Sequence, residues 1–331
     1  MIKLSPFAIG ALSAACSAAT AAPEQTDYAK PHQRIEVEGR HLNLFCMGSG
    51  SPTIIFESGA GVAGWGWQLV QPTISKKNRA CTYDRAGLGF SEPSPLAGTS
   101  VNAVNDLHKL LSAAGLHPPF VLVGHSYGGM NVQLFAYRYP SMVSGLVLVE
   151  AQHEDERERL DRVSQGKLSL MTASLLDSYR KCTDASKLAF QPPAEPFAAC
   201  VGEPYKFAKG PFSKAYTNQF RKPTYWEAHS SELEHLYTSS SEQLRSARKA
   251  FGSLPVACLI RSVSPYMAPG SPPTQTSMAA EQENDAMQRE VASLSSRGNC
   301  KVVPGAGHDI AIDRPQAVIQ AIREVLKQQA K

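Results

Sequence analysis

The chain has 331 residues, of which 43% are hydrophobic and 19% charged, a composition typical of soluble globular proteins. The formal net charge is +4 and no run of basic residues occurs, which argues against nucleic acid as a partner. About 300 residues can bury one large core, so a single α/β domain that carries an insertion is expected.

Residues 1–22 are predicted to be a secretory signal peptide. Lys3 opens an apolar run rich in small residues, which ends at Ala22 before Pro23. The run is too short to span a bilayer, so cleavage near Ala22 is favoured over an integral membrane span. The mature protein would then be secreted or periplasmic. A lipoprotein anchored through Cys16 is the alternative.

Six of the seven cysteines lie beyond this segment. An even number of cysteines in an exported chain favours disulfides. Many connectivities are possible, but the strands assigned below favour the pairs Cys46–Cys81, Cys182–Cys200 and Cys258–Cys300. The sequence contains no CxxC spacing and no pair of histidines at the spacing of metal ligands, so no metal site is expected.

The first predicted elements belong to one edge of a sheet. Residues 33–47 alternate polar and apolar side chains across Gly39, which predicts a hairpin. Residues 52–58 predict a short buried strand, and the glycine-rich segment 59–64 follows it directly.

The segment 59–64 has the spacing G-x-G-x-x-G, which raises the possibility of a dinucleotide site. Residues 79–84 predict the next strand, with Asp84 at its end. The glycine strand is third in the chain, however, and the Trp-Gly-Trp that follows is a poor helix start. We therefore interpret these glycines as permitting close backbone approach beside Ser126, and Asp84 as a structural turn or ion-pair residue.

A stronger motif follows an amphipathic helix predicted over residues 102–114. The apolar run 120–123 leads into Gly-His-Ser-Tyr-Gly at 124–128, and helical spacing continues to residue 139. Strand, glycine-flanked turn and helix are the context in which G-x-S-x-G forms a nucleophile elbow. Ser126 is therefore predicted to be an exposed nucleophile. Its neighbour His125 is interpreted as a packing and hydrogen-bonding residue.

The next strand, residues 145–150, ends in Glu150 after four apolar residues, a costly place for a charge without a partner. Over residues 152–250 no strand pattern occurs and prolines separate short helical pieces, which predicts a helical cap. Its aromatic residues, which either line a pocket or form the core of the cap, include Tyr205, Phe207, Phe212, Tyr216, Phe220, Tyr225 and Trp226.

The sheet is predicted to resume at residues 255–260, followed by a helix over 281–296 and a last strand at 300–303. His308 follows that strand in a glycine-rich turn. Asp313 is predicted to be the N-cap of a closing helix. This helix would carry three apolar residues on one face: Val318, Ile322 and Val325.

Ser126, Glu150 and His308 each stand at or just past the carboxyl end of a predicted parallel strand. Open α/β sheets gather their functional residues at that edge. A serine hydroxyl needs an imidazole to take its proton, and the imidazole needs a buried carboxylate to fix its tautomer. The order serine, acid, histidine is that of the nucleophile-elbow hydrolases. Three other carboxylates remain alternatives for the acid: Asp155, Asp285 and Asp309.

These motifs together resemble the α/β-hydrolase superfamily, and within it the capped esterase, peptidase and dehalogenase branch. The resemblance rests on the glycine turn that begins at Glu57, the elbow at 124–128, Tyr-Asp-Arg-Ala-Gly-Leu-Gly-Phe-Ser at 83–91 and Gly-Ala-Gly-His-Asp-Ile at 305–310. It covers roughly residues 35–150 and 250–331. The expected fold is a mostly parallel twisted sheet with helices on both faces and a helical cap.

The sequence therefore predicts a division of the chain into a signal peptide (1–22), a first core part (23–151), the cap (152–250) and a second core part (251–331). Many members of the family carry the triad acid after the strand that ends here at Ile260. That position reads Arg-Ser-Val-Ser-Pro, without a carboxylate. Some haloalkane dehalogenases place a glutamate after the preceding strand instead, which corresponds to Glu150.

A serine nucleophile implies acyl transfer, with His308 as general base and no metal or organic cofactor. The oxyanion donors would be the backbone N–H groups of Tyr127 and Ala60, with Gly61 as the alternative to Ala60. The resemblance favours an exported carboxylesterase acting on a small or medium ester, with no protein partner indicated. The alternatives are an aminopeptidase or amidase, a lactonase, and a non-catalytic binding protein on the same scaffold. An aminopeptidase would need a cap carboxylate for the substrate amine, and the candidates are Glu227, Glu232 and Glu234.

Overall fold

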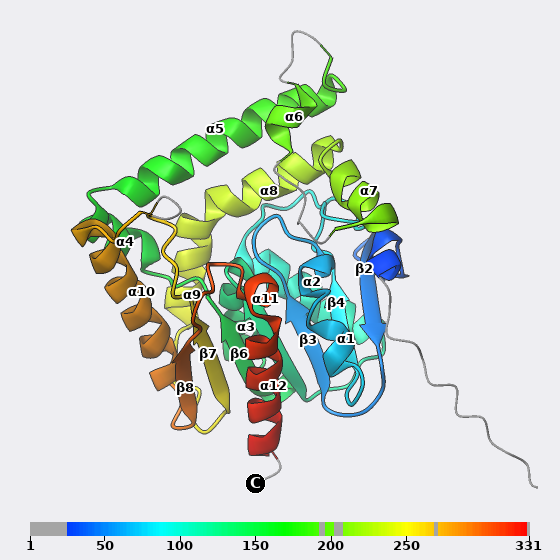
Figure 1. Ribbon diagram of the computed structural model, residues 1–331. Helices are drawn as coiled ribbons and strands as arrows, with labels where there is room; N and C mark the ends of the chain where they lie inside the picture. Colours follow the sequence, from blue (N-terminus) through cyan, green and yellow to red (C-terminus); the bar gives the residue numbers. More distant parts are fainter. Residues whose placement is uncertain (1–24, 192–195, 202–207, 268–270, 330–331) are drawn as a thin grey trace, which may run out of the picture.

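The computed structural model describes residues 25–191, 196–201, 208–267 and 271–329 (Figure 1). The predicted signal peptide 1–22 with Cys16, and two of the cap aromatics, Tyr205 and Phe207, lie outside the described residues.

In the described part of the chain, eight strands form one sheet in the order β1-β2-β4-β3-β5-β6-β7-β8. Only β2 runs antiparallel to its neighbours β1 and β4, and every other neighbouring pair is parallel. The predicted α/β class and the predicted edge hairpin are therefore confirmed. The strands are β1 (Gln33–Val37), β2 (Arg40–Met47), β3 (Thr53–Glu57), β4 (Ala80–Tyr83), β5 (Phe120–His125), β6 (Val143–Val149), β7 (Val256–Ile260) and β8 (Gly298–Val302).

Helices cover both faces of the sheet. The α-helices are α1 (Gln71–Ile74), α2 (Ser100–Ala113), α3 (Tyr127–Arg138), α4 (Glu156–Ser164), α5 (Lys167–Lys187), α6 (Phe197–Cys200), α7 (Gly210–Gln219), α8 (Pro223–His235), α9 (Ser241–Ala247), α10 (Gln275–Ser293), α11 (Ile310–Asp313) and α12 (Pro315–Gln329). Shorter helical turns are η1 (Gln25–Ala29), η2 (Gly64–Trp67), η3 (Pro140–Met142) and η4 (Leu236–Ser240).

The strand β5 shows why the two layers form. Its six residues are all buried, and alternate side chains point to opposite faces. Leu122 joins the apolar cluster shared with α2, α3, α9 and α10. Val121 and Val123 join the second cluster, formed with α1, α11 and α12. The central strand that leads to Ser126 is thus fixed by packing on both sides.

Residues between β6 and β7 form helices α4 to α9, and no strand occurs among the described residues of this segment. Figure 1 shows α5 and α8 above the end of the sheet where the parallel strands finish. The helix α9 contacts α2 and α3 of the core layer. The boundaries 152–250 for a cap stay a prediction. Because α9 packs on helices of the core layer, it favours a cap that ends before α9 begins.

The aromatic residues predicted for the cap form a shared core with the sheet domain. Phe212, Phe220, Tyr225 and Trp226 are buried in one cluster together with Trp65, which follows β3. Burial of each large aromatic side chain contributes about 1.5–3 kcal/mol of apolar transfer free energy. The helical segment is therefore packed on the domain and is not an independent unit.

Two sequence predictions at the C-terminal end need correction. The helix α10 begins at Gln275, earlier than predicted, because Thr274 and Ser277 form a capping box at its start. This box was not predicted from the sequence, since its second residue is a serine and not the usual glutamate or glutamine. Asp313 is not the N-cap of the closing helix α12. This helix starts two residues later, at Pro315, because proline is favoured at the first position of a helix. The Asp313 carboxylate instead accepts a hydrogen bond from the Gly307 N–H at 2.8 Å. The predicted apolar face of α12 is confirmed, since its three residues are fully buried: Val318, Ile322 and Val325.

The three predicted disulfides are all present. Cys46 and Cys81 are directly opposite each other on β2 and β4, and Cys258 and Cys300 on β7 and β8. The third bond joins α5 to α6 through Cys182 and Cys200. Two bonds therefore cross-link neighbouring strands, and one connects the C-terminal part of α5 to α6.

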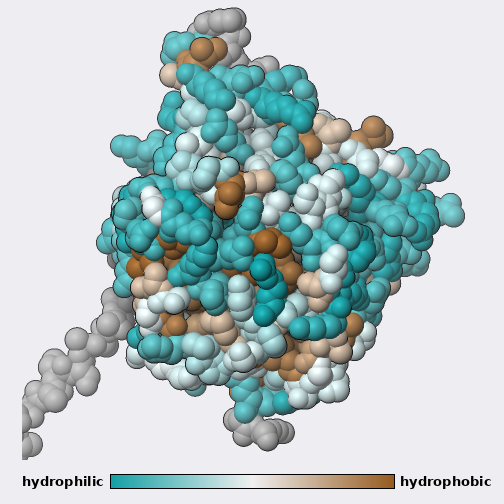
Figure 2. Space-filling view, turned by 180° about the vertical axis from the view of Figure 1, so that it is seen from behind, coloured by the Kyte–Doolittle hydropathy of each residue, from teal (hydrophilic) through white to brown (hydrophobic). Residues whose placement is uncertain are grey.

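No helix in the described part of the chain has the length and apolar character needed to cross a membrane. Figure 2 shows the face opposite that of Figure 1 as mostly hydrophilic, with small hydrophobic areas separated by polar surface. The larger exposed apolar side chains include three on α5: Leu170, Met171 and Leu175.

Candidate active site

Ser126 lies at the sharp turn between β5 and α3. Its φ of 53° is in a region that non-glycine residues rarely adopt. The backbone is held there by hydrogen bonds from Ser126 N–H to the Val149 carbonyl (3.2 Å) and from Gln152 N–H to the Ser126 carbonyl (2.9 Å). Both partners flank the end of β6. The turn therefore leaves the serine partly exposed at the carboxyl edge of the sheet.

The flanking glycines are required by close backbone approach. A Cβ on Gly124 would lie 2.4 Å from the Gly128 carbonyl oxygen. A Cβ on Gly128 would lie 2.2 Å from the carbonyl oxygen of Glu57, at the end of β3. Any side chain at either position would push the helix away from the strand, so this is the geometry expected of a nucleophile elbow.

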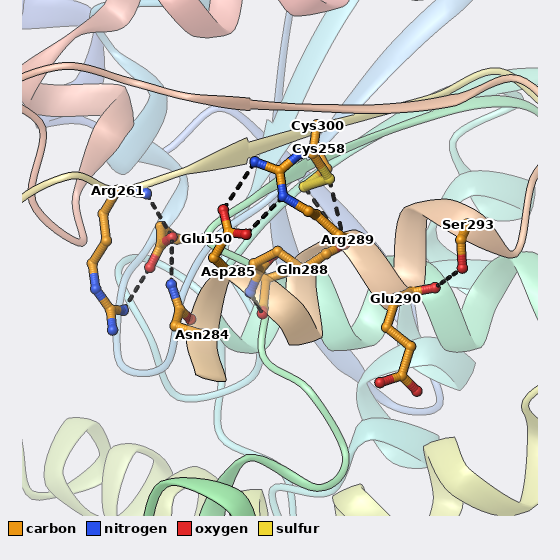
Figure 3. The surroundings of a disulfide bond; sticks show 11 residues. Glu150, Cys258, Arg261, Asn284, Asp285, Gln288, Arg289, Glu290, Ser293 and Cys300 are labelled. Atoms are coloured by element: carbon orange, nitrogen blue, oxygen red, sulfur yellow. Dashed lines mark hydrogen bonds and ion pairs between the residues drawn. A yellow bond between two sulfur atoms is a disulfide. The ribbon is translucent and has the colours of Figure 1, made fainter. Parts of the chain in front are cut away.

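Glu150 follows β6 and is only 2% exposed. One of its carboxylate oxygens accepts the Arg261 backbone N–H at 2.7 Å, and the other accepts the Arg261 guanidinium Nη1 at 2.6 Å. Asn284 of α10 donates from Nδ2 at 3.3 Å. Figure 3 shows Arg261 and Asn284 both directed at this carboxylate, so the buried charge has the partners that its sequence position required.

Burial raises the pKa of Glu150, but the His308 ring, the Arg261 charge and the Arg261 backbone N–H outweigh it and lower the pKa to about 2. The carboxylate is therefore ionised at neutral pH. Its Oε2 lies 3.6 Å from Nδ1 of His308.

His308 follows β8 and, in contrast to Glu150, its side chain is 44% exposed. The surrounding protein keeps water from the part of the ring that faces Glu150, which lowers the pKa of the imidazole, while the Glu150 carboxylate raises it. The net effect is a pKa above the usual value. Because Nδ1 faces Glu150, Nε2 is the ring nitrogen left to exchange a proton with a substrate or nucleophile.

His125 links the elbow to the loop that carries His308. Its Nε2 lies 2.9 Å from the His308 carbonyl oxygen, and the two rings are 4.8 Å apart between centroids. Burial lowers the pKa of His125 to about 4, so the ring is neutral and serves as a hydrogen-bond donor. In the described part of the chain the Ser126 hydroxyl makes no hydrogen bond. Hydrogen bonds between a catalytic nucleophile and its base often form fully only when substrate is bound.

The glycine turn after β3 lies beside the elbow, because a Cβ on Gly59 would approach the Ser126 Cβ to 3.4 Å. Gly61 N–H donates to Glu232 of α8 at 2.8 Å. No acceptor in the described residues engages the N–H of Ala60 or of Tyr127. Of the predicted oxyanion donors, Ala60 and Tyr127 are thus free, whereas the alternative donor Gly61 is occupied.

The Asp84 side chain has the structural role that the sequence suggested. Buried at the end of β4, it accepts hydrogen bonds from Gly64 N–H (2.7 Å), Asn43 (2.9 Å) and Phe90 N–H (2.9 Å). The glycine segment continues into the short turn η2 and not into a long helix. These two features remove the basis of a dinucleotide site at this position.

The alternative acids are placed elsewhere or are solvated. Asp155 pairs with Arg245 at 2.7 Å, and the partner of Asp285 is an arginine on its own helix, Arg289. Asp309 is exposed and lies 3.8 Å from His125. Glu150 is the carboxylate that the structure brings to His308.

The candidate amine-binding glutamates of α8 are also paired. Glu227 contacts Lys187 at 3.1 Å and Glu234 contacts Arg180 at 3.2 Å, both near the surface. Glu232 is buried and contacts Arg85 at 2.7 Å. No group of three or more potential metal ligands occurs among the described residues.

A cavity of about 340 Å³ lies between the glycine turn and the cap helices. It reaches Ala60 and is lined mainly by aromatic side chains, with Gln219 and His229 as polar groups. The aromatic lining residues are Trp65, Tyr179, Tyr216, Phe220, Tyr225 and Trp226. A larger cavity of about 390 Å³ lies on the other side of α8, lined by the segment 93–99, the start of α2 and Tyr127. Neither Ser126 nor His308 is among the described residues that line either cavity.

Sequence reasoning missed two arginines at this edge, Arg261 and Arg85. Arg261 occupies the position after β7 at which many family members carry the acid. A positive charge at this position could have indicated that Arg261 is the partner of Glu150. Arg85 stands within a glycine-rich turn, and nothing in that turn identifies its partner on α8.

Comparison with known proteins agrees with this geometry. Residues 54–321 match the model of the alpha/beta hydrolase family, so the chain belongs to that family. A protein of the AB hydrolase superfamily from Gibberella zeae is 25% identical over 83% of this chain and 86% of its own length. Matches to two curated Bacillus subtilis relatives span only 36% and 41% of their lengths.

Two solved structures share the fold. A putative epoxide hydrolase from Pseudomonas aeruginosa has a TM-score of 0.62 at 17% identity, covering 90% of this chain and 95% of the other. A thermophilic esterase from Thermogutta terrifontis has a TM-score of 0.57 at 20% identity, covering 91% and 100%. At these identities the likeness establishes the hydrolase fold.

The lowered pKa of Glu150 has a consequence for stability. Because its folded-state pKa of about 2 lies below the ordinary value of 4.5, the ionised carboxylate stabilises the native state above that value. This contribution, about 3 kcal/mol, is lost as the pH falls towards 2. We expect the free energy of unfolding, measured in urea from pH 6 to 2.5, to fall less steeply in Glu150→Gln than in the wild type.

Asp285→Asn is the matched control, because Asp285 is a more exposed carboxylate paired with Arg289. Its pH profile should follow that of the wild type. Equal slopes for Glu150→Gln and the wild type would contradict the assigned ion pairing.

Proposed function

We propose that this protein is an exported serine hydrolase, and most specifically a carboxylesterase for small or medium esters. The observation that carries the proposal is the convergence at one sheet edge of a serine in an elbow, Ser126, and a histidine paired with a buried carboxylate, His308 with Glu150. A serine nucleophile favours acyl transfer over dehalogenation or epoxide opening, because an ester carbonyl is the electrophile that a serine alkoxide attacks.

In the first half of the reaction, Ser126 Oγ attacks the ester carbonyl carbon while His308 Nε2 accepts the hydroxyl proton. The ionised Glu150 stabilises the resulting imidazolium and keeps Nδ1 protonated. The carbonyl oxygen becomes an oxyanion, which the N–H groups of Ala60 and Tyr127 would bind. Removing one such donor typically costs about 3 kcal/mol of transition-state stabilisation. Collapse of the intermediate transfers the proton to the leaving alcohol and yields an acyl-enzyme.

In the second half, His308 removes a proton from a water molecule as that water attacks the acyl-enzyme. Collapse returns the proton from His308 to Ser126 and releases the carboxylic acid. One water is consumed for each ester bond broken, and the enzyme returns to its starting state. The side-chain exposure of His308 gives water access for this step.

The 340 Å³ cavity beside Ala60 supports a small or medium substrate with an apolar group. The ion pairs of Glu227, Glu232 and Glu234 argue against capture of a substrate amine, which makes an aminopeptidase the weaker alternative. An amidase, a lactonase and a non-catalytic binding protein remain the competing functions, and they differ in which substrates turn over.

The first test is labelling with a fluorophosphonate, which reacts with activated serines. We expect the wild type to be labelled and Ser126→Ala to be unlabelled, because the probe is attacked only by the elbow hydroxyl. Hydrolysis of p-nitrophenyl acetate and butyrate should be lost in the same variant. Labelled protein that hydrolyses amides or lactones faster than esters would replace the esterase assignment, and folded wild type that is never labelled would favour a binding protein.

The second test is the pH dependence of kcat/KM for such an ester. His308 must be neutral to accept a proton, and its raised pKa places the acidic limb of the profile above the ordinary imidazole value of 6.5. Glu150→Gln removes the charge that raises this pKa, so the limb should move to lower pH while kcat decreases. An unmoved limb would mean that Glu150 is not the partner of the general base.

The export part of the proposal is tested by intact mass. Protein recovered from the exported fraction should correspond to residues 23–331 with six cysteines in disulfides, and alkylation before reduction should add no mass. Alkylation after reduction serves as the control and should modify all six. An unprocessed N-terminus or six free thiols would refute export.

A further inference from the structure

A buried network joins the cap helix α8 to the glycine turn. Glu232 of α8 is 4% exposed, although it carries a charge. Its two oxygens accept Arg85 Nε at 2.7 Å and Arg85 Nη2 at 2.9 Å, and Oε2 also accepts the Gly61 N–H at 2.8 Å. One cap carboxylate therefore binds both a core arginine and the backbone of the turn.

The other edge of the Arg85 guanidinium binds the residues before Ala60. Nη1 donates to the Ser58 carbonyl oxygen at 2.6 Å, and Nη2 donates to the Gly59 carbonyl oxygen at 2.7 Å. The Glu232–Arg85 pair therefore binds backbone groups on both sides of Ala60, namely the carbonyls of Ser58 and Gly59 before it and the Gly61 N–H after it. Among the residues that the structure describes, the peptide N–H of Ala60 has no acceptor.

The same network reaches the elbow helix. Arg85 Nη1 lies 3.0 Å from Glu57, whose carboxylate accepts Asn131 Nδ2 of α3 at 3.1 Å. The Arg85 guanidinium also lies over the Tyr127 ring, 5.3 Å from its centroid. Both proposed oxyanion donors, Ala60 and Tyr127, thus belong to segments that contact one buried arginine.

We propose that Glu232 is a positioning residue that orients the Ala60 N–H for the oxyanion, so that the placement of the cap on the domain determines whether the oxyanion hole is complete. This inference rests on the proposed serine-hydrolase function. The physical reason is that the Ala60 N–H belongs to the same planar peptide unit as the Gly59 carbonyl, whose oxygen accepts Arg85 Nη2 at 2.7 Å, and Glu232 binds that same Nη2 at 2.9 Å. The direction of the Ala60 N–H therefore depends on the Glu232–Arg85 pair.

A role of Glu232 in binding a substrate cation is not consistent with these contacts. Both carboxylate oxygens already accept hydrogen bonds from Arg85, and displacing that guanidinium would leave it buried between Glu57 and the turn without its second partner. The carboxylate therefore acts through the turn and not on the substrate.

The experiment compares Glu232→Gln and Glu232→Ala with Glu234→Ala. Glu234 lies on the same helix and pairs with Arg180 at the surface, so it controls for loss of a cap charge. Hydrolysis of p-nitrophenyl butyrate is measured after active serines are counted with the fluorophosphonate. We expect kcat to fall about 10²-fold in Glu232→Ala with KM changed less than about threefold, since the loss concerns the transition state. Glu232→Gln, which keeps an acceptor for Gly61 N–H, should lie in between.

A second readout separates positioning from a merely structural role. A trifluoromethyl ketone forms a tetrahedral oxyanion on the nucleophile, so its inhibition constant should increase in step with the loss of kcat/KM across the variants. Thermal midpoints report stability in parallel. Variants with a lower midpoint but wild-type kcat and inhibition constant would overturn the inference. If Glu232→Ala fails to fold, Glu232→Gln alone decides between these results.

The two proposals can fail separately. Absence of fluorophosphonate labelling in the wild type would refute the serine-hydrolase function itself. Normal wild-type labelling and turnover, combined with unchanged kinetics in both Glu232 variants, would refute only the positioning role.

Discussion

The structure depends on the strained backbone of Ser126. A residue with φ of 53° between a strand and a helix is stable only if its surroundings determine its conformation. The strand β5 is packed on both faces, and every residue of α3 from Tyr127 to Tyr137 is buried. The backbone groups of Ser126 bind Val149, the last residue of β6, and Gln152 in the loop that follows. Packing of the whole central layer therefore stabilises one turn, and the exposed hydroxyl is the result.

Three buried glutamates at the same edge are each paired with an arginine. Glu150 pairs with Arg261, and Glu57 and Glu232 share Arg85. A guanidinium suits this task because its planar set of donors can bind a carboxylate and backbone carbonyls at once. Removing one member of such a pair typically costs about 3–5 kcal/mol, because the other charge is left buried. The pairs thus maintain the edge while leaving Ser126 and His308 accessible.

Much of this arrangement could be predicted from local sequence. The strand-turn-helix context correctly placed Ser126 in the turn between β5 and α3, and strand neighbours correctly predicted two disulfides. The glycine-rich turn after the last strand singled out His308 as the candidate base, and the structure places it beside Glu150. The ion pairs could not be predicted in this way, since Glu150 and Arg261 are separated by 111 residues and Arg85 and Glu232 by 147. Asp313 was misassigned for a different reason: its carboxylate accepts the N–H of Gly307, 6 residues earlier, and does not cap the closing helix.

Arg261 stands after β7, where a carboxylate was sought in the sequence, and it pairs with Glu150, the carboxylate that faces His308. Arg261 is close enough to lower the pKa of His308 by its charge, which would weaken a general base. It also binds Glu281 of α10 through Nε and Nη2, at 3.0 and 3.1 Å, so its charge is shared between two carboxylates. The net effect of the surrounding charges is a His308 pKa above the usual value. Glu150, Arg261 and Glu281 thus form one electrostatic unit of two carboxylates and one arginine.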